Sequence, residues 1–396
     1  MCHDLAMQRF TTLFPLFGSL FLASCGEPEK EVVKDAPTGP ESPWSRADWP
    51  VARGGAGLSG QVGDPVLKNP VTLWTFETEG PIAGEAVVSQ GLVAFGNDLG
   101  WLHVLDLKTG EPKWKKEFED SIEAAPAIFE DTLFIGCQDT YLYALNLATG
   151  EERWKIQTNE KITAGVNITP SPDGSTHWVV LNGYDGACRA LDAKTGDQVW
   201  IHQTEEYING TPAIVDGKWI VFGGCDRILY TLDLATGKPA KQVETNAEIV
   251  STVATEGTFV AWGNYGNEVL AADVTAGKTS WTYTDRKFPF MSAPAIDKTR
   301  VYIGCRDKKI HAISREDGNG IWKYKTGGRV ESSPLLFTNA LVCGSSDGRL
   351  YAIDLEKGEE IWRVDLGESI IAAPSFADGI LLVGSEDGTL FALGEE

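Results

Sequence analysis

The stretch Val104-Leu-Asp-Leu-Lys-Thr-Gly-Glu-Pro-Lys-Trp114 decides the fold of this 396-residue chain, because close copies of it recur along the sequence. The copies run from Ala144 to Trp154, Ala190 to Trp200, Thr231 to Lys241, Ala271 to Trp281, Ala312 to Trp322 and Ala352 to Trp362, and Trp74 is an eighth copy of the end of the motif. Successive end positions lie 40 or 41 residues apart, except for one step of 46. A repeat of about 40 residues is typical of the four-stranded blades of a β-propeller.

Each part of the repeat has a structural explanation. The side chain of Asp106, or its equivalent, bonds the backbone two residues later, and Gly110 takes the positive φ of a tight turn. The indole of Trp114 is a large flat group that suits the space between neighbouring blades. Seven of the eight copies keep the Trp, and the copy that ends at Lys241 does not.

A second acidic residue recurs in the hairpin before each motif, at Asp139, Asp185, Asp226, Asp307, Asp347 and Asp387. A metal-binding role is the alternative for such carboxylates. One Asp per blade at the same hairpin position is better explained as a turn residue. We therefore predict no metal site.

The ends of the repeat region predict how the ring closes. The chain stops after three strands of an eighth blade, at Phe391-Ala-Leu-Gly-Glu-Glu, and residues 71–77 around Trp74 supply the missing fourth strand. We therefore predict an all-β, eight-bladed β-propeller over residues 71–394, with four-stranded antiparallel blades closed by an N-terminal strand. Closure removes exposed sheet edges, so we expect a monomeric propeller.

Two blades depart from the pattern. The blade after Trp154 carries an insertion around residues 169–175, and the blade after Lys241 lacks the Trp, the Pro and the hairpin Asp. Neutral drift explains both departures, and the alternative is a partner that docks on that side.

Residues 1–24 read as a signal peptide, because a short polar start is followed by an apolar run too short to span a membrane. Leu22-Ala-Ser-Cys25 matches the lipobox of bacterial lipoproteins, which predicts lipidation of Cys25. The alternative is an ordinary secretory signal. Gly26 follows Cys25, and in enteric bacteria the absence of Asp at this position resembles an outer-membrane rather than an inner-membrane sorting signal, so we expect a lipid-anchored, periplasm-facing protein at the outer membrane.

The segment between the anchor and the repeats has two parts. Residues 25–43 are rich in Glu, Lys, Pro, Ser and Thr and predict a flexible tether. Residues 44–70 are Gly-rich but carry Trp44 and Trp49, so we expect a cap that lies on the propeller. A carbohydrate or partner site at these two Trp residues is the alternative to plain packing.

The net charge limits the classes of partner, and the number of cysteines indicates the state of the thiols. The formal net charge is −22, which argues against nucleic acid and, apart from the covalent anchor, against anionic membrane surfaces. Five cysteines remain after Cys2 and Cys25: Cys137, Cys188, Cys225, Cys305 and Cys343. An odd number cannot all pair, so we expect free buried thiols.

The motif Ala-Leu-Asp-x-x-Thr-Gly-x-x-x-Trp closely resembles the pyrroloquinoline quinone (PQQ) repeat, over roughly residues 71–394. The resemblance implies one of two groups: periplasmic quinoprotein dehydrogenases that use PQQ with calcium, or BamB-like lipoproteins that act as scaffold subunits in outer-membrane β-barrel assembly. The stretch Asp48-Trp-Pro-x-x-Arg-Gly54 also resembles the lead-in of PQQ-like propeller proteins from planctomycete-type bacteria.

The dehydrogenase group requires parts that this sequence lacks. Its members carry two adjacent cysteines over the cofactor, and no Cys-Cys pair occurs here. They also have long insertions between blades. Arg329 is a candidate to receive the PQQ carboxylates, but Glu331 lies beside it. We therefore predict no cofactor and no enzymatic activity, and keep a PQQ- or sugar-binding protein or a reduced quinoprotein dehydrogenase as the alternative.

The scaffold group requires a lipid anchor, a tether, short blades and exposed loops, which this sequence offers. Partners of propellers usually bind loops around the central funnel. We therefore predict contacts with envelope proteins, such as a β-barrel assembly complex, at Tyr207, Phe288, Phe290, Glu123 and Arg329. In BamB-like proteins a loop with Leu and Arg docks the assembly protein, and the nearest stretch here, residues 201–207, contains neither residue type.

Overall fold

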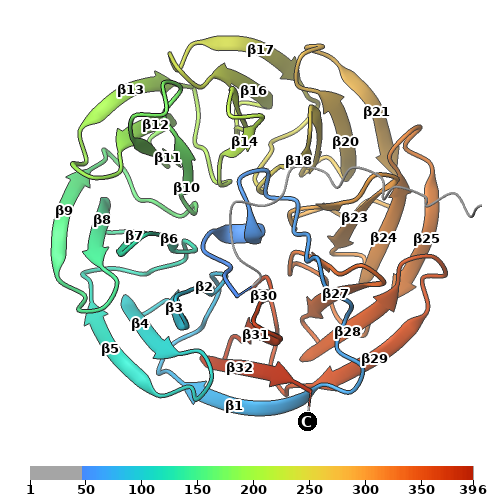
Figure 1. The fold of residues 1–396 in the computed structure, drawn as a ribbon. Helices are drawn as coiled ribbons and strands as arrows, with labels where there is room; N and C mark the ends of the chain where they lie inside the picture. The colour runs from blue at the N-terminus through green and yellow to red at the C-terminus, as the bar shows by residue number, and fades with distance from the viewer. Residues whose placement is uncertain (1–46, 396) are drawn as a thin grey trace, which may run out of the picture. The chain divides into compact units, whose positions relative to one another are not determined.

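The computed structural model describes residues 47–395, and the predictions for the signal peptide, Cys25, the tether and Trp44 lie outside this range. The described part forms 32 β-strands and one 3-10 turn, η1 (Ala52–Gly54). The strands make eight four-stranded antiparallel sheets in a closed ring (Figure 1). The predicted eight-bladed propeller is thus confirmed. No helix in residues 47–395 is long and apolar enough to cross a membrane.

Each blade runs from a short strand at the central axis to an outermost strand. The strands of blades 1 to 4 are β2 (Val87–Ser89), β3 (Leu92–Gly96), β4 (Trp101–Asp106) and β5 (Pro112–Glu117); β6 (Ala127–Phe129), β7 (Thr132–Gly136), β8 (Tyr141–Asn146) and β9 (Glu152–Gln157); β10 (Asn167–Pro170), β11 (His177–Asn182), β12 (Ala187–Asp192) and β13 (Gln198–Gln203); β14 (Ala213–Val215), β15 (Trp219–Gly223), β16 (Ile228–Asp233) and β17 (Pro239–Glu244).

The strands of blades 5 to 8 follow in the same order. They are β18 (Ala254–Glu256), β19 (Phe259–Gly263), β20 (Glu268–Asp273) and β21 (Thr279–Thr284); β22 (Ala295–Ile296), β23 (Arg300–Cys305), β24 (Lys309–Ser314) and β25 (Gly320–Lys325); β26 (Leu335–Leu336), β27 (Ala340–Ser345), β28 (Arg349–Asp354) and β29 (Glu360–Asp365); β30 (Ser375–Ala377), β31 (Ile380–Gly384), β32 (Thr389–Gly394) and β1 (Val71–Glu77).

The ring closes where β1 pairs with β32, as predicted. The pairing is antiparallel and runs from Val71 opposite Gly394 to Glu77 opposite Thr389. Figure 1 shows the first strand, in blue, beside the last one, in red. Because the first and last strands share one blade, no edge stays open at the seam.

The Trp of each repeat joins its blade to the next one. The Trp114 Nε1 donates a hydrogen bond to the carbonyl oxygen of Leu147 in blade 2, at 2.9 Å. Its indole lies over Gly150, where an added Cβ would stand 2.9 Å from the ring. The Trp and the Gly that recur in the motif are therefore the two sides of one contact between blades.

The same contact recurs around the ring. Trp74, Trp154, Trp200, Trp281, Trp322 and Trp362 donate to the carbonyls of Leu107, Ala193, Leu234, Arg315, Leu355 and Leu67. Leu67 precedes β1, so the last Trp finds its acceptor in the N-terminal segment. Lys241 breaks the series, and Gly277 lies against its aliphatic chain instead.

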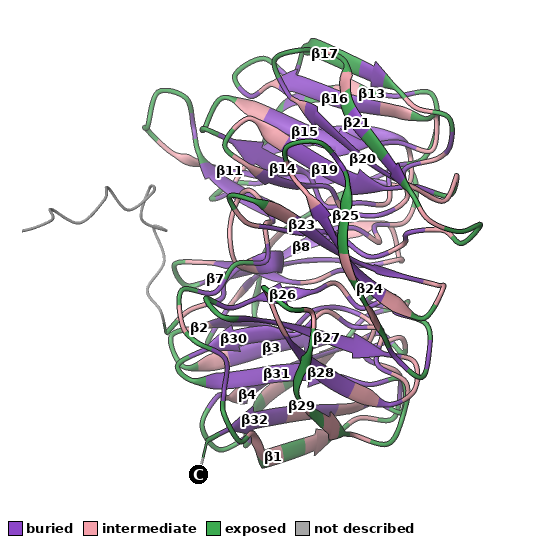
Figure 2. Cartoon of the chain, turned by 90° about the vertical axis from the view of Figure 1, so that its right-hand side faces the viewer, coloured by how far each residue is buried: buried purple, intermediate pink, exposed green. Residues whose placement is uncertain are grey.

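Clusters of buried side chains fill the space between blades. Val104 of β4, for example, packs in one cluster with Ile135 of β7 and Leu145 of β8. Figure 2 shows the buried residues, in purple, along the inner strands and the exposed ones, in green, at the loops and outermost strands. The core is therefore divided into wedges between blades.

Residues 47–61 run across the inner ends of the blades, and the chain then runs outward past blade 7 to β1 (Figure 1). Their carbonyl oxygens accept hydrogen bonds from the inner strands: Trp49 from Val88, Pro50 from Ile128, Ala56 from Ile214, Gly57 from Thr255, Ser59 from Ile296 and Gly60 from Leu336. Inner strands would otherwise leave these amides unpaired. Close approach explains Gly57, since an added Cβ there would lie 3.0 Å from the Thr255 oxygen.

The contact between Trp and Gly can be tested with a matched pair of substitutions. Gly150 and Gly277 both have positive φ, +71° and +67°, but only Gly150 meets an indole. We expect Gly150→Ala to lower the free energy of unfolding by about 1–3 kcal/mol more than Gly277→Ala, because the methyl group collides with a rigid ring. Urea unfolding of both variants measures the difference. Equal losses would show that backbone strain alone explains the glycine.

Candidate functional site

One face of the ring collects two sets of loops, which we call the rim. The rim comprises the loops that enter each blade, residues 78–86, 118–126, 158–166, 204–212, 245–253, 285–294, 326–334 and 366–374, and the hairpins 97–100, 137–140, 183–186, 224–227, 264–267, 306–308, 346–348 and 385–388. Backbone hydrogen bonds join hairpin to loop, as from Tyr184 to the Lys161 oxygen and from Cys225 to the Tyr207 oxygen, both at 3.0 Å. Side chains from both sets therefore meet.

Three tyrosines gather on the rim of blades 3 to 5, and we call Tyr184, Tyr207 and Tyr265 the tyrosine patch. The rings of Tyr184 and Tyr207 stack, with centroids 4.4 Å apart. The Lys161 ammonium lies 4.8 Å from the centroid of Tyr184. Burial raises the pKa of Tyr184, with smaller contributions from neighbours that include Tyr207 and Tyr265. Tyr207 and Tyr265 are each 47% exposed, so the patch offers aromatic surface to a partner.

The predicted contact residues divide into two groups. Tyr207 and Phe288 are exposed, as are Glu123 and Arg329. Phe290 is only 1% exposed and packs against Tyr283 and His311 with ring centroids 6.3 and 5.2 Å away. Phe290 is therefore a core residue and is removed from the contact set, because its backbone turns the side chain inward two residues after Phe288.

Sequence reasoning missed Tyr184 and Tyr265. It considered only the loops that follow each Trp, whereas these two residues lie in the hairpins. A signal was present, since both tyrosines occupy the hairpin position just before Asp185 or Gly266, where neighbouring blades have Gln138 and Cys225. The pairing of hairpin with entry loop shows why the two positions form one surface.

The central channel is occupied by Arg53, which is 3% exposed. Its Nη2 donates to the Pro334 oxygen at 2.5 Å and to the Pro294 oxygen at 3.2 Å, while Nε and Nη1 have no hydrogen-bond partner. The residue has φ of +59°, a strained left-handed conformation. Arg53 thus reaches from η1 into the space between the inner strands.

Glu85 is the buried carboxylate beside this arginine. One of its oxygens accepts from the Trp49 Nε1 at 2.5 Å and from the Arg53 backbone amide at 2.9 Å. Burial raises the pKa of Glu85 to about 7, against the opposing effect of the Arg53 charge. The Asp-Trp-Pro-x-x-Arg-Gly stretch therefore has a structural role: its Trp and Arg hold Glu85 and close the channel.

The residues of the channel do not fit PQQ. The cavity beside Arg53 has a volume of about 180 Å³, whereas ligand pockets usually measure about 300–1,000 Å³. Its lining includes the carboxylates of Glu85 and Glu123, which repel a tricarboxylate. No adjacent cysteines are present in the chain. We therefore derive no chemistry through this cofactor.

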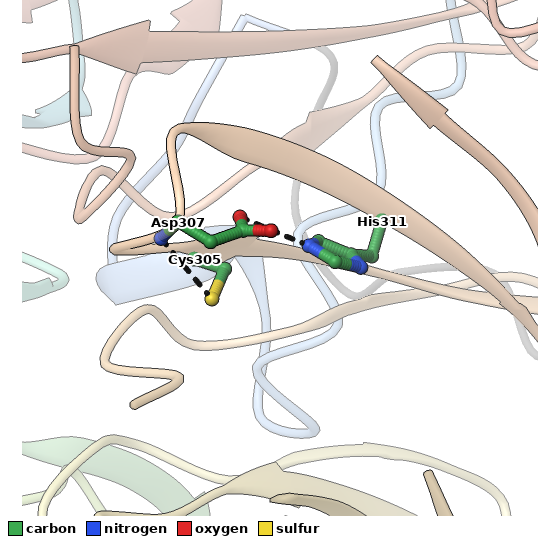
Figure 3. A group of neighbouring side chains, drawn as sticks. All are labelled: Cys305, Asp307 and His311. Carbon is green, nitrogen blue, oxygen red and sulfur yellow. Dashed lines mark hydrogen bonds and ion pairs between the residues drawn. The ribbon is translucent and has the colours of Figure 1, made fainter. Parts of the chain in front are cut away.

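A group of three potential metal ligands lies in blade 6: Cys305, Asp307 and His311 (Figure 3). Their ligand atoms all lie within 4.8 Å of one another. The His311 Nε2 stands 3.2 Å from one Asp307 oxygen, and the Lys309 ammonium stands 2.7 Å from the other. The Tyr283 hydroxyl is 3.0 Å from the His311 Nδ1.

Comparison with other blades explains this group as a turn pair. Hairpin Asp residues bond a side chain four residues later in Asp139–Tyr143, Asp226–Tyr230 and Asp347–Tyr351, at 2.6 to 2.7 Å. His311 replaces that tyrosine. Although burial raises it, hydrogen bonds from His311 and Lys309 hold the pKa of Asp307 well below its usual range.

The Lys309 ammonium, which is paired with Asp307, would repel a cation at this group. Burial raises the pKa of the Cys305 thiol to about 12. Of the five described cysteines, all are free and four are buried, with Cys225 half-buried.

Comparison with known proteins gives three results. The family model described as outer membrane protein assembly factor BamB matches residues 68–205, 184–342 and 325–396. The outer membrane protein assembly factor BamB of Burkholderia pseudomallei (strain K96243) is 28% identical over 178 residues, which cover 41% of this chain and 45% of that protein. The match therefore spans less than half of the length of that relative.

Solved structures share the fold. The crystal structure of BamB from Moraxella catarrhalis has a TM-score of 0.68 at 19% identity, covering 83% of this chain and 98% of that one. Quinohemoprotein alcohol dehydrogenase from Comamonas testosteroni has a TM-score of 0.75 at 15% identity, covering 88% and 81%. At these identities the likeness establishes architecture alone.

Titration of Glu85 predicts a specific pH dependence. Its folded pKa of about 7 exceeds the ordinary value of 4.5, so the folded state retains a proton that the unfolded chain releases. Its contribution to stability is therefore complete below about pH 4.5 and is lost as the pH rises to about 7. Urea unfolding at pH 5 and 7.5 should show this loss for the native protein relative to Glu85→Gln. Parallel pH profiles would contradict the assignment.

The turn-pair explanation of the blade 6 group makes a second prediction. We expect His311→Tyr to change the free energy of unfolding little, because three other blades carry Tyr there. Asp307→Leu should cost about 2–4 kcal/mol, because Lys309 and His311 lose their acceptor. Thermal unfolding measured with added Zn²⁺ or with a chelator should not shift. A Zn²⁺-dependent rise in the midpoint would instead establish a metal site.

Proposed function

The chain belongs to the family of the outer membrane protein assembly factor BamB, and from this premise we propose that it is a non-enzymatic scaffold for outer-membrane protein assembly. In this proposal the protein is lipid-anchored through Cys25 and faces the periplasm. The lipobox sequence Leu22-Ala-Ser-Cys25 supports the anchor.

The observation that carries the proposal is the exposed aromatic surface of the rim. Tyr207 and Tyr265 are each 47% exposed and Phe288 is 44% exposed, on loops of three successive blades. Aromatic side chains with so much free surface are enriched where proteins bind one another. In the proposal they form the centre of the docking surface.

A closed channel further favours a scaffold over an enzyme. Arg53 and the segment 49–61 occupy the space that a cofactor would need, and two glutamates line what remains. The propeller therefore offers surface rather than a reaction chamber.

The net charge of the chain indicates which charge a partner surface should carry. The chain carries a formal net charge of −22, so a partner surface that docks here should be basic. Glu123 lies exposed on the rim in blade 2, and the Lys161 ammonium lies over the ring of Tyr184 in the tyrosine patch. Acidic loops around an aromatic centre would speed association with a basic partner and make it sensitive to salt.

Capture from native membranes tests the proposal. Tagged full-length protein should co-purify with the β-barrel component of the outer-membrane assembly machinery. We expect the Tyr207→Ala/Phe288→Ala double variant to weaken that association at least about tenfold, as loss of a hot spot does. The capture of the assembly component should also fall as ionic strength rises.

Ile361→Ala is the matched control. Ile361 is 43% exposed but lies on outermost strand β29, away from the rim loops. Its truncation should leave capture unchanged. If wild-type protein never recovers an assembly component, or if the Ile361 variant loses as much as the double variant, the proposed function is wrong.

A further inference from the structure

Blade 1 breaks the hairpin rule that the other blades follow. Leu99 stands where most blades have the turn Asp, and His103 follows it four residues later. His103 is 6% exposed, and its Nε2 is buried without a hydrogen-bond partner. The Nδ2 of Asn97, a residue 1% exposed, is equally unpartnered. The Nδ2 of Asn97 and the Nε2 of His103 are thus buried and unsatisfied, as is the Oδ1 of Asp98 in the same hairpin.

Other blades show how such groups are normally satisfied. In blade 6 the equivalent histidine, His311, pairs with hairpin Asp307 at 3.2 Å. In blade 5 the equivalent amide, the Nδ2 of Asn264, donates to the Glu268 carboxylate at 3.0 Å. Blade 1 has Leu99 and Trp101 at these two partner positions. His103 and Asn97 therefore lack these partners because Leu99 and Trp101 are apolar.

Both side chains line a groove between blade 8 and blade 1. The groove has a volume of about 450 Å³ and lies between β1 of blade 8 and β4 and β5 of blade 1. Figure 1 shows β1, the strand that closes the ring, next to β4 and β5 of blade 1. We call the groove between them the seam groove. A buried polar group without a partner destabilises the fold, so a ligand that bonds these two atoms would recover that lost free energy.

The walls of the groove are aromatic. Phe76 of β1 meets the His103 ring at a centroid distance of 5.4 Å and an angle of 64°. Trp101 contributes a half-buried indole, and the Lys115 ammonium stands 4.2 Å from the centre of that ring. The groove thus combines flat apolar faces with hydrogen-bonding groups at their edges.

The charges of the groove are balanced. Its lining contains two carboxylates, Glu77 and Glu79, and two ammonium groups, Lys113 and Lys115. Burial, with a smaller contribution from Lys115, lowers the pKa of His103 to about 4, so the imidazole is neutral at pH 7. No net field selects an anion or a cation, which favours a neutral ligand.

We propose that this seam groove binds a neutral carbohydrate. Sugar rings have apolar C–H faces that stack on aromatic rings and a periphery of hydroxyls that bond amides, carboxylates and imidazoles. Phe76 and Trp101 supply the aromatic faces, and Asn97 and His103 supply unsatisfied partners for hydroxyls. The volume falls in the range of small-molecule pockets, of a size for one or two sugar rings.

Titration calorimetry of the full-length protein with maltotriose and with chitotriose tests the proposal. We expect saturable binding of at least one trisaccharide. Trp101→Ala should weaken it at least about tenfold, since it removes a stacking face. Tyr141→Ala is the matched control, because Tyr141 occupies the same strand position in blade 2, and it should bind as the native protein does.

Leu99→Asp separates loss of the site from loss of the fold. The substitution restores the Asp–His pair seen in blade 6, so it should satisfy His103, leave the thermal midpoint equal or higher, and abolish sugar binding. Absence of saturable binding of both trisaccharides, or equal affinity in Leu99→Asp, would overturn the proposal. Binding of a phenylalanine-containing tripeptide in their place would identify a peptide groove instead.

The proposed sugar site and the proposed scaffold function can be tested independently of each other. The groove lies at blades 8 and 1, whereas the tyrosine patch lies at blades 3 to 5. Trp101→Ala should therefore retain capture of the assembly component, and the Tyr207→Ala/Phe288→Ala variant should retain sugar binding. Loss of both activities in either variant would contradict two independent sites.

Discussion

The contact between the Trp of one blade and the Gly of the next is the interaction on which the rest of the structure depends. Six of the seven indoles lie on a turn glycine of the next blade and donate their N–H to a carbonyl of the same turn, as Trp114 does with Gly150 and Leu147, whereas Trp362 keeps only the hydrogen bond, to Leu67. Orientation and spacing of neighbouring blades are set by this one contact, repeated at seven seams. Between blades 7 and 8 the acceptor is the carbonyl oxygen of Leu67, which lies in the segment before β1.

Closure of the ring creates a second constraint at its centre. Eight inner strands present unpaired amides toward the axis, and residues 49–61 provide carbonyls for six of them. Bringing this segment in also buries Arg53 beside Glu85, and burial raises the pKa of Glu85 to about 7 against the opposing effect of the Arg53 charge. The channel is consequently a structural element, and the surfaces left for function are the rim and the grooves between blades.

The role of a residue that departs from the repeat depends on the side chains around it. A histidine follows the hairpin in both blade 1 and blade 6, yet His311 has Asp307 as its partner and His103 has none. The first completes a turn that other blades build with tyrosine. The second leaves a buried ring nitrogen without a partner in a side chain that lines an aromatic groove. The same residue type thus serves packing in one blade and is free for recognition in the other.

The sequence by itself determined the number of blades, their strand order and the closing strand, because turn glycines, tryptophans and the 40-residue period are local signals that repeat. It also indicated the exposed Tyr207 and Phe288. Only the tertiary structure decided that Phe290 is buried, that Tyr184 stacks on Tyr207, and that Arg53 meets Glu85. These facts depend on side-chain directions and on contacts between residues far apart in the chain, which a period along the sequence does not specify.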